Sequence, residues 1–297
     1  EINDLMNLRM AKYCLVWAMC LAVSIIPIAG RSYAQSPGAP QEQKFASKLM
    51  AHDMPYRVIL PNGYDDKVNA TVKYPVIYLL HGLTGHYTNW ADKTKLSDYA
   101  SKHSFILVMP EGNDGWYTDS VSVPNDKYES YIVKELIPEI DGKFRTMANR
   151  EHRVIAGLSM GGYGSLKFGL KYPDMFSLVG SFSGAIDAPL RGQTHTNYRP
   201  SIMAVFGADD SPLRKENDVF TIVSKISAER LKRLPFLYFA CGTEDLVNFQ
   251  LNRDFAGLLI EKKIPHEYRE LPGAHTWEFW DDQVREFLDV AERRLKK

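Results

Sequence analysis

The chain has 297 residues, of which 45% are hydrophobic, and its 36 basic and 36 acidic side chains give a formal charge of zero. This length and apolar content suffice to bury a large core. The balanced charge, with no basic stripe and no acidic tail, argues against a nucleic-acid partner.

The first 34 residues have the pattern of an export signal peptide. Arg9 and Lys12 precede an uncharged apolar stretch over 13–30, and a small-x-small cleavage site follows at 32–34. The small-residue site favours a cleaved signal over a membrane span. We therefore predict cleavage near Ala34, a secreted or periplasmic protein, and no stable membrane association after the signal is removed.

The domain organisation predicted beyond the signal is simple. Residue 1 is not Met, so we interpret 1–9 as a possible upstream extension, with Met10 as a candidate start. The small and polar residues that follow the signal indicate a flexible lead-in over 35–50. No internal repeat and no second domain is evident, and a single domain is expected over 51–297.

Cysteine usage limits how the domain can be stabilised. Cys14 and Cys20 lie in the predicted signal, which leaves only Cys241 in the mature chain. One cysteine can form neither an internal disulfide nor a cysteine metal site, so stability must come from the hydrophobic core.

Strand-like and helical segments alternate along the rest of the chain. Apolar runs typical of strands occur at 54–61, 74–82, 104–110, 153–159, 175–184, 201–207, 235–242 and 266–271. Segments typical of helices occur at 93–103, 126–144, 163–172, 216–233, 246–263 and from about Glu278. This alternation predicts one α/β domain with a mostly parallel central sheet and helices on both faces.

One serine lies in a cluster of small residues at a strand-to-helix junction. Gly157, Ser159 and Gly161 form a G-x-S-x-G sequence directly after the strand predicted at 153–159 and before a predicted helix. At such a junction the motif is a nucleophile elbow, a strained turn that exposes the hydroxyl. Strain and close packing there would explain the glycines. We predict Ser159 as the nucleophile.

A serine nucleophile needs a base, and in this fold the base follows the acid and comes last in the chain. Three histidines follow Ser159. His266 begins a predicted strand and His195 lies in a polar loop, whereas His275 lies between the last strand and the last helix. His275 is therefore the predicted base, and a capping or packing role is the alternative.

The orienting acid should lie one helix and one strand before the base. Asp245 meets this requirement, because the helix and strand predicted over 246–271 separate it from His275. The alternatives are Glu244 beside it and the pair Asp209 and Asp210, for which a solvated loop or a helix cap is the other interpretation.

Acyl transfer also needs backbone donors for the oxyanion. Met160 follows the nucleophile at a helix N-terminus, and Leu83 follows Gly82 in the loop after an early strand, so their N–H groups are the predicted oxyanion hole. His81 and His86 in the same loop could indicate a metal, but no third ligand is evident, and we expect no metal and no cofactor.

Several of these motifs together resemble one family. The matching stretches are "MPYRVILP", "YPVIYLLHGLTGHYTNW", "VMPEGNDGWYTDS", "AGLSMGGYGSLKFGLKYPDMFSLVGSFSGA" and "GAHTWEFW". They resemble the esterase D family of esterases over roughly residues 50–295, and the "DGWYTDS" block is most similar to its tributyrin-esterase branch. The resemblance implies an α/β-hydrolase fold, Ser159, Asp245 and His275 as catalytic triad, and Leu83 and Met160 as oxyanion donors.

The same family is related to feruloyl esterases, S-formylglutathione hydrolases and antigen 85 mycolyltransferases. The resemblance therefore implies an exported serine carboxylesterase for short-chain acyl or feruloyl-type esters, such as small acyl esters or acylated polysaccharide. An acyltransferase shares the triad and stays open as an alternative. The predicted export counts against a cytosolic S-formylglutathione hydrolase-like thioesterase. The three filled triad positions count against a non-catalytic binding module.

The substrate pocket is the part of the site that the sequence defines least. Only residues 186–200 separate two predicted strands after the nucleophile, which is too short for a large cap domain, so an open pocket is expected. Trp116, Tyr117, Tyr198 and Trp277 are candidates for lining it, and a core position is the alternative for each.

Overall fold

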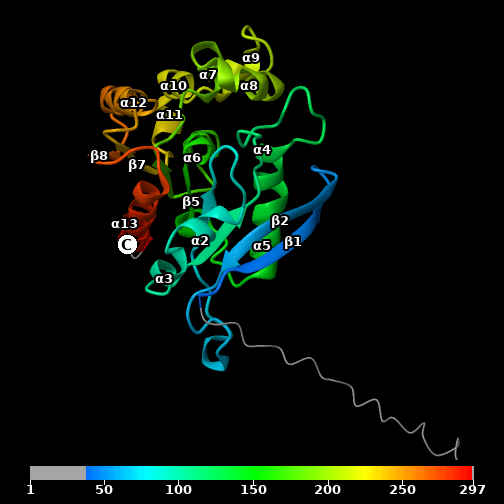
Figure 1. The fold of residues 1–297 in the computed structure, drawn as a ribbon. Coiled ribbons are helices and arrows are strands. Elements are labelled where there is room, and N and C mark those ends of the chain that lie inside the picture. Colours follow the sequence, from blue (N-terminus) through cyan, green and yellow to red (C-terminus); the bar gives the residue numbers. More distant parts are fainter. Residues whose placement is uncertain (1–37, 296–297) are drawn as a thin grey trace, which may run out of the picture. The chain divides into compact units, whose positions relative to one another are not determined.

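The sheet is built around the continuous apolar runs of the sequence. The computed structural model describes residues 38–295, so the export signal predicted over 1–34 lies outside the described residues. The strands are β1 (Gln41–Ser47), β2 (His52–Ile59), β3 (Val76–Leu80), β4 (Ile106–Pro110), β5 (Arg153–Leu158), β6 (Leu178–Phe182), β7 (Phe236–Gly242) and β8 (His266–Leu271). They form one sheet in the order β1-β2-β4-β3-β5-β6-β7-β8 (Figure 1). β2 pairs antiparallel with β1 and β4, and all other neighbours are parallel, which confirms the predicted fold class.

Both faces of the central strands are buried. In β3, Val76, Tyr78 and Leu80 belong to one apolar cluster, and Ile77 and Leu79 belong to a second cluster on the opposite face. All five side chains are fully buried. Alternation along a strand places successive side chains on opposite faces, so an unbroken apolar run is stable only where helices cover both.

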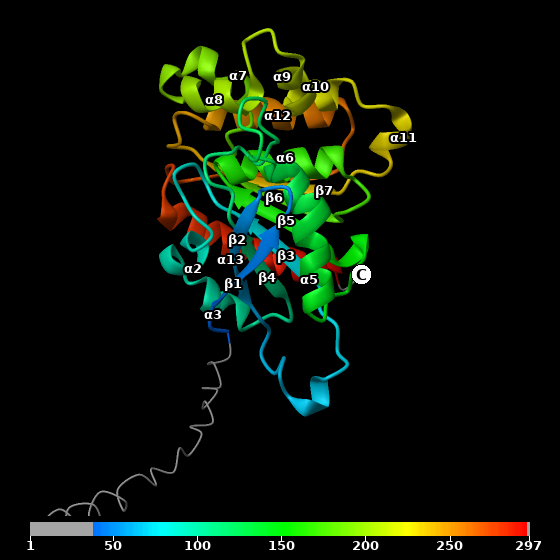
Figure 2. The ribbon, with the colours of Figure 1, turned by 90° about the vertical axis from the view of Figure 1, so that its right-hand side faces the viewer.

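Helices supply that cover. The α-helices are α2 (Asn89–Lys93), α3 (Leu96–Ala100), α4 (Tyr128–Tyr131), α5 (Ile137–Lys143), α6 (Met160–Lys171), α7 (Ala188–Thr194), α8 (Arg199–Phe206), α9 (Pro212–Asn217), α10 (Val219–Ser224), α11 (Ala228–Leu231), α12 (Phe249–Glu261) and α13 (Trp277–Leu295). A π-helical turn, η2 (Ile132–Leu136), joins α4 to α5, and η1 (Lys67–Asn69), η3 (Arg150–His152) and η4 (Thr196–Tyr198) are 3₁₀ turns. Helices α5, α6 and α12 contribute to the first cluster, and α3 and α13 to the second (Figures 1 and 2). Among the described residues no helix combines the length and apolarity that a membrane span requires.

The segment expected to be a flexible lead-in over 35–50 contains a strand. Gln41–Ser47 forms β1, an edge strand paired with β2 along its whole length. Phe45 points inward and stacks on Tyr131 at 5.8 Å between ring centroids. Five of its seven residues are polar, so composition alone indicated a linker.

The strand predicted at 201–207 is instead helix α8. Its buried side chains, Ile202, Val205 and Phe206, follow the three- and four-residue spacing of a helix. Pro200 lies in the first turn, and Gly207 ends the helix with a positive φ of 81°. An apolar run of five residues fits either a strand or a helix, and Pro200 and Gly207 favour the helix.

The helix predicted over 216–233 is divided into short helices. The Asp218 side chain caps α10 by accepting from the N–H groups of Phe220 and Thr221. Ser227 caps α11 by accepting from the N–H of Arg230. The connection between β6 and β7 is thus helical, and it is longer than the stretch 186–200 considered from the sequence. Helices α7 to α10 lie farther from the sheet than α6 does (Figure 2).

Candidate active site

Four parallel strands bring the predicted site residues to one edge of the sheet. β3, β5, β7 and β8 end at Leu80, Leu158, Gly242 and Leu271. The loops that follow them carry the predicted oxyanion donor, nucleophile, acid and base, in that order. Because carboxyl ends of parallel strands lie at the same edge, residues far apart in the sequence meet there.

The turn at Ser159 is strained, as an elbow requires. Its backbone has φ 53° and ψ −115°, which side chains rarely adopt. A Cβ atom at Gly157 would lie 2.5 Å from the carbonyl carbon and oxygen of Gly161, and one at Gly161 would lie 2.3 Å from the carbonyl oxygen of Leu80. Only glycine fits at either position, which accounts for the small residues around Ser159.

Ser159, His275 and Asp245 form a hydrogen-bonded chain. The Oγ atom of Ser159 lies 3.0 Å from Nε2 of His275, and Nδ1 of His275 lies 2.8 Å from Oδ2 of Asp245. Asp245 is buried, whereas the imidazole is partly exposed. The edge of the Trp280 ring faces the imidazole at 4.8 Å between centroids. This order of groups, a hydroxyl bonded to an imidazole that is bonded to a buried carboxylate, is the arrangement that activates a serine as a nucleophile.

Asp245 is held by a residue that the sequence analysis did not identify. The backbone N–H and the side-chain amide of Asn248 donate to Asp245 Oδ1 at 3.1 and 3.2 Å. Burial alone would raise the pKa of Asp245, but the hydrogen bonds from His275 and Asn248 lower it below its ordinary value. Arg191 donates to Asn248 Oδ1 at 2.6 Å. Nothing local in the sequence indicates this contact, because α7 and the loop after β7 meet only in the fold.

The segments that carry the two predicted oxyanion donors both lie beside the serine. Met160 is the first residue of α6, so its N–H has no partner within that helix. Leu83 follows β3 in a turn closed by a hydrogen bond from Gly85 N to Gly82 O at 3.0 Å. A Cβ at Gly82 would lie 3.3 Å from Cβ of Ser159, so the loop passes close beside the nucleophile.

A buried carboxylate joins the two histidines of that loop. Glu111 Oε1 lies 3.0 Å from His81 Nε2, and Glu111 Oε2 lies 3.2 Å from His86 Nδ1. From the sequence, His81 and His86 were considered as a pair without Glu111. Glu111 directly follows β4, which is the neighbour of β3, so the order of strands in the sheet would have revealed it.

A cavity of about 260 Å³ surrounds Ser159. Leu83, His275, Trp277 and Trp280 are among its lining residues. Of the candidate substrate residues, Trp277 alone lines this cavity, with its ring against those of Trp280 and Trp90. A second cavity of about 480 Å³ also has Thr84 and Gly85 in its lining, so both cavities border the same loop.

The other aromatic candidates do not line the cavity around Ser159. Trp116 and Tyr117 are buried in the core, both with positive φ, 50° and 51°. The Tyr117 hydroxyl donates to the carbonyl oxygen of His81 at 3.0 Å, which places it behind the loop. Tyr198 packs edge-on against Trp116 at 6.4 Å. An aromatic residue that lies near a site motif in the sequence can therefore be buried away from the substrate cavity.

The alternative acids and bases lie elsewhere or make other contacts. Asp209 pairs with Arg199 at 3.1 Å. It follows helix α8 and not a strand, so it does not reach the edge where Ser159 lies. His266 Nδ1 bonds the carbonyl of Ile264 at 2.8 Å, which agrees with a packing role.

Comparison with known proteins identifies a family and several related esterases. The family model described as "Putative esterase" matches residues 47–288. An acetyl esterase of Caldicellulosiruptor saccharolyticus is 28% identical over 250 residues, which cover 81% of this chain and 93% of that protein.

Two solved structures share the fold at similar identity. FphF, a fluorophosphonate-binding serine hydrolase of Staphylococcus aureus, is 27% identical with a TM-score of 0.78, over 86% of this chain and 99% of that one. A ferulic acid esterase is 26% identical with a TM-score of 0.74, over 86% and 98%. The chain therefore belongs to the putative esterase family, and it is a carboxylic ester hydrolase with the α/β-hydrolase fold.

Proposed function

We propose that this protein is an exported serine carboxylesterase that cleaves short-chain acyl or feruloyl-type esters through an acyl-enzyme intermediate on Ser159. The observation that carries the proposal is the chain of hydrogen bonds from Ser159 Oγ to His275 Nε2 at 3.0 Å and from His275 Nδ1 to Asp245 Oδ2 at 2.8 Å. It begins at a strained strand-to-helix turn, which is the position of the nucleophile in this fold.

The first half-reaction forms the acyl-enzyme. His275 Nε2 takes the Ser159 proton while Oγ attacks the ester carbonyl carbon, and the carbonyl oxygen becomes an oxyanion. The N–H groups of Leu83 and Met160 stabilise this oxyanion. When the tetrahedral intermediate collapses, the bond to the alcohol oxygen breaks, and His275 gives its proton to the leaving alcohol.

The second half-reaction releases the acid. Water occupies the position of the departed alcohol, His275 accepts one of its protons, and the hydroxide attacks the acyl carbon. Collapse of the second tetrahedral intermediate breaks the bond to Ser159 Oγ, which recovers its proton from His275. Asp245 holds the imidazole in the tautomer that leaves Nε2 free to accept, and it stabilises the imidazolium that forms.

The size and walls of the cavities support the substrate class. The cavity around Ser159, at about 260 Å³, is smaller than the ~300–1,000 Å³ usual for ligand pockets, so it suits the ester and a short acyl group. Trp277 and Trp280 offer aromatic surfaces for a feruloyl ring. The adjoining cavity of about 480 Å³ offers room for the remainder of a larger ester, such as a sugar. Likeness to an acetyl esterase and to a ferulic acid esterase supports both acyl groups.

Export is part of the proposal on the strength of the sequence alone. Basic residues, an apolar stretch and a small-residue site precede residue 35. Expression of the full chain in a bacterial host, followed by fractionation and N-terminal sequencing, tests it. Processing near Ala34 with activity outside the cytoplasm is expected, and an unprocessed cytoplasmic protein would contradict it.

A hydrolysis panel tests the activity and its substrate class. Acetyl, butyryl, decanoyl and feruloyl esters are compared with a formyl thioester, each with the wild-type protein and with Ser159→Ala. We expect the highest kcat/KM for acetyl, butyryl or feruloyl esters and no turnover by the variant. Adding an alcohol acceptor should divert only a minor share of product. A product mixture dominated by the transferred ester would instead establish an acyltransferase.

A further inference from the structure

A buried histidine–glutamate pair lies behind the loop that carries Leu83. We propose that His81 and Glu111 are positioning residues, which fix and polarise the peptide group between Gly82 and Leu83 so that the Leu83 N–H points toward the oxyanion. The inference rests on the proposed function, because it requires Leu83 as an oxyanion donor.

The imidazole of His81 bridges a backbone carbonyl and a carboxylate. The ring is fully buried, with Nδ1 2.8 Å from the carbonyl oxygen of Gly82 and Nε2 3.0 Å from Glu111 Oε1. The backbone N–H of Gly112 lies 2.9 Å from both Nε2 and Glu111 Oε1, so it joins the ring to the carboxylate. The carbonyl oxygen of Gly82 can only accept, so Nδ1 carries the proton of that hydrogen bond.

The bond to Gly82 acts on Leu83 because both belong to one peptide group. The carbonyl of Gly82 and the N–H of Leu83 lie in one plane and point in opposite directions across a trans bond. The same carbonyl accepts from Gly85 N at 3.0 Å, so turning the Leu83 N–H away would disrupt two hydrogen bonds. Donation to the carbonyl also polarises the peptide, which strengthens the N–H as a donor by ~10–30% per bond.

Glu111 anchors the imidazole from the far side. It is 6% exposed, and it accepts from the N–H of Asn113 at 2.7 Å and faces His86 Nδ1 at 3.2 Å. Burial alone would raise the pKa of Glu111, but the hydrogen bond and charge of His81, together with backbone N–H groups, lower it to about 2. The carboxylate is therefore anionic throughout the working range of an esterase.

The preceding peptide group is held as well. The hydroxyl of Tyr117 donates to the carbonyl oxygen of His81 at 3.0 Å, and Lys167 Nζ on α6 donates to the carbonyl of Tyr117 at 2.6 Å. Tyr117 keeps a positive φ of 51°, a strain that this pair of contacts maintains. Both peptide groups before Leu83 are thus fixed from the protein interior.

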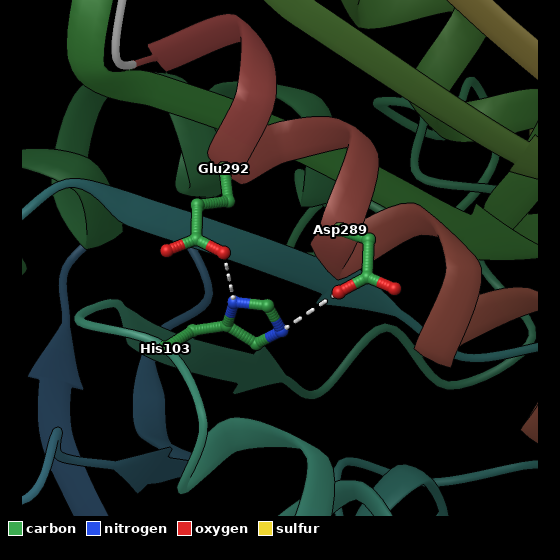
Figure 3. Close-up of side chains that lie close together, drawn as sticks. All are labelled: His103, Asp289 and Glu292. Carbon is green, nitrogen blue, oxygen red and sulfur yellow. Dashed lines mark hydrogen bonds and ion pairs between the residues drawn. The ribbon is translucent and has the colours of Figure 1, made fainter.

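A second buried histidine provides a matched control. His103, before β4, faces Glu292 through Nδ1 at 3.1 Å and Asp289 through Nε2 at 3.4 Å, both on α13 (Figure 3). The two carboxylates lie at opposite edges of its ring, so the ring joins side chains and does not hold a backbone carbonyl. Replacing Glu292 removes a similar charge from a similarly buried imidazole without acting on the Leu83 peptide.

The test separates positioning from stability. For Glu111→Gln and Glu292→Gln we measure kcat and KM with 4-nitrophenyl acetate, Tm, and Ki of a trifluoromethyl ketone, which adds to the serine to form an oxyanion. Loss of a whole oxyanion donor lowers kcat by ~10²–10³-fold. For a donor that is only misaligned we expect Glu111→Gln to lower kcat by about 10–100-fold and raise Ki by the same factor, with KM within about 2-fold. Glu292→Gln should leave kcat and Ki unchanged.

Two substitutions of His81 distinguish a hydrogen-bonding role of this residue from a packing role. The amide of Asn can place an N–H near the position of Nδ1, toward Gly82, whereas Gln reaches the position of Nε2, toward Glu111. We expect His81→Asn to keep at least about 5-fold more kcat than His81→Gln, because a bond to the carbonyl matters more than a bond to Glu111. This comparison keeps the inference testable even if Glu111→Gln does not fold.

Three results would overturn the inference: unchanged kcat in folded Glu111→Gln, a fall in kcat with no rise in Ki, or His81→Gln as active as His81→Asn. Ser159→Ala distinguishes these from failure of the proposed function. If Ser159→Ala is inactive and Glu111→Gln is fully active, only the positioning role fails. If Ser159→Ala stays active, the proposed mechanism with Ser159 as nucleophile is itself wrong.

Discussion

Replacing Asp245 by Asn tests the assignment of the acid in a way that depends on the geometry around it. The N–H and the side-chain amide of Asn248 both donate to Asp245 Oδ1, at 3.1 and 3.2 Å. In the variant these donors hold the new carbonyl oxygen at the Oδ1 position. The new NH₂ group then takes the Oδ2 position, 2.8 Å from His275 Nδ1.

An NH₂ group there can only donate, so His275 Nδ1 becomes an acceptor and the ring proton moves to Nε2. Nε2 then faces Ser159 Oγ with a proton and cannot accept another. We expect kcat to fall by about 10³- to 10⁴-fold, or about 4–5.5 kcal/mol of transition-state stabilisation. Because the side chain keeps its volume and both hydrogen bonds that Asn248 donates to the Oδ1 position, Tm should change by only a few degrees.

The assay is the initial rate of 4-nitrophenyl acetate hydrolysis at saturating substrate, with Asp209→Asn as control. Asp209 is exposed and pairs with Arg199 and with the buried Arg214, none of which lines the cavity around Ser159, so its substitution should leave kcat within about 2-fold. If Asp209→Asn proved the more damaging change, or Asp245→Asn kept a tenth of wild-type kcat, the account of the acid would be wrong.

Two further predictions concern stability. Gly161→Ala should lower the free energy of unfolding in urea by about 3 kcal/mol or more, because its Cβ would lie 2.3 Å from the Leu80 carbonyl oxygen. Gly257 lies in an exposed part of α12, where an added Cβ would have no neighbour within 4 Å, so Gly257→Ala should raise the free energy of unfolding by ~0.5–1 kcal/mol. If the two variants changed the free energy of unfolding equally, the packing argument would be refuted. Burial would raise the pKa of Glu129, but Lys167 and a second lysine lower it from 4.5 to about 2, so its ionised form stabilises the fold. That contribution is complete above pH ~4.5 and is lost as the pH falls toward 2, and urea titrations should show a weaker loss for Glu129→Gln; an unchanged acid dependence would contradict it.

The positions of Ser159, Asp245 and His275 could be predicted because each follows a strand whose end was visible in the sequence. Parallel strands end at one edge, so the order of segments already implied their meeting. The strained backbone at Ser159 and the contacts that only Gly161 permits were likewise implied by the spacing of the glycines.

What could not be predicted depends on contacts between distant segments. β1 was missed because a polar edge strand gains its stability from a few inward side chains, such as Phe45 and Ser47, and from pairing with β2. Tyr117 was a candidate for the pocket with a core position as the alternative, and it is buried, with its hydroxyl bonded to the His81 carbonyl. Asn248 and Glu111 act on site residues through hydrogen bonds that no local pattern indicates.

The central claim is that Ser159 carries the acyl group, and covalent labelling tests it most directly. The wild-type protein and Ser159→Ala are incubated with an alkyl fluorophosphonate, and adducts are located by intact-protein and peptide mass spectrometry while esterase activity is followed. We predict one adduct per chain on Ser159, with loss of activity in proportion to labelling. The variant should show no adduct and at least ~10⁴-fold lower turnover. Labelling at another residue, or a tenth of wild-type activity in Ser159→Ala, would contradict the account.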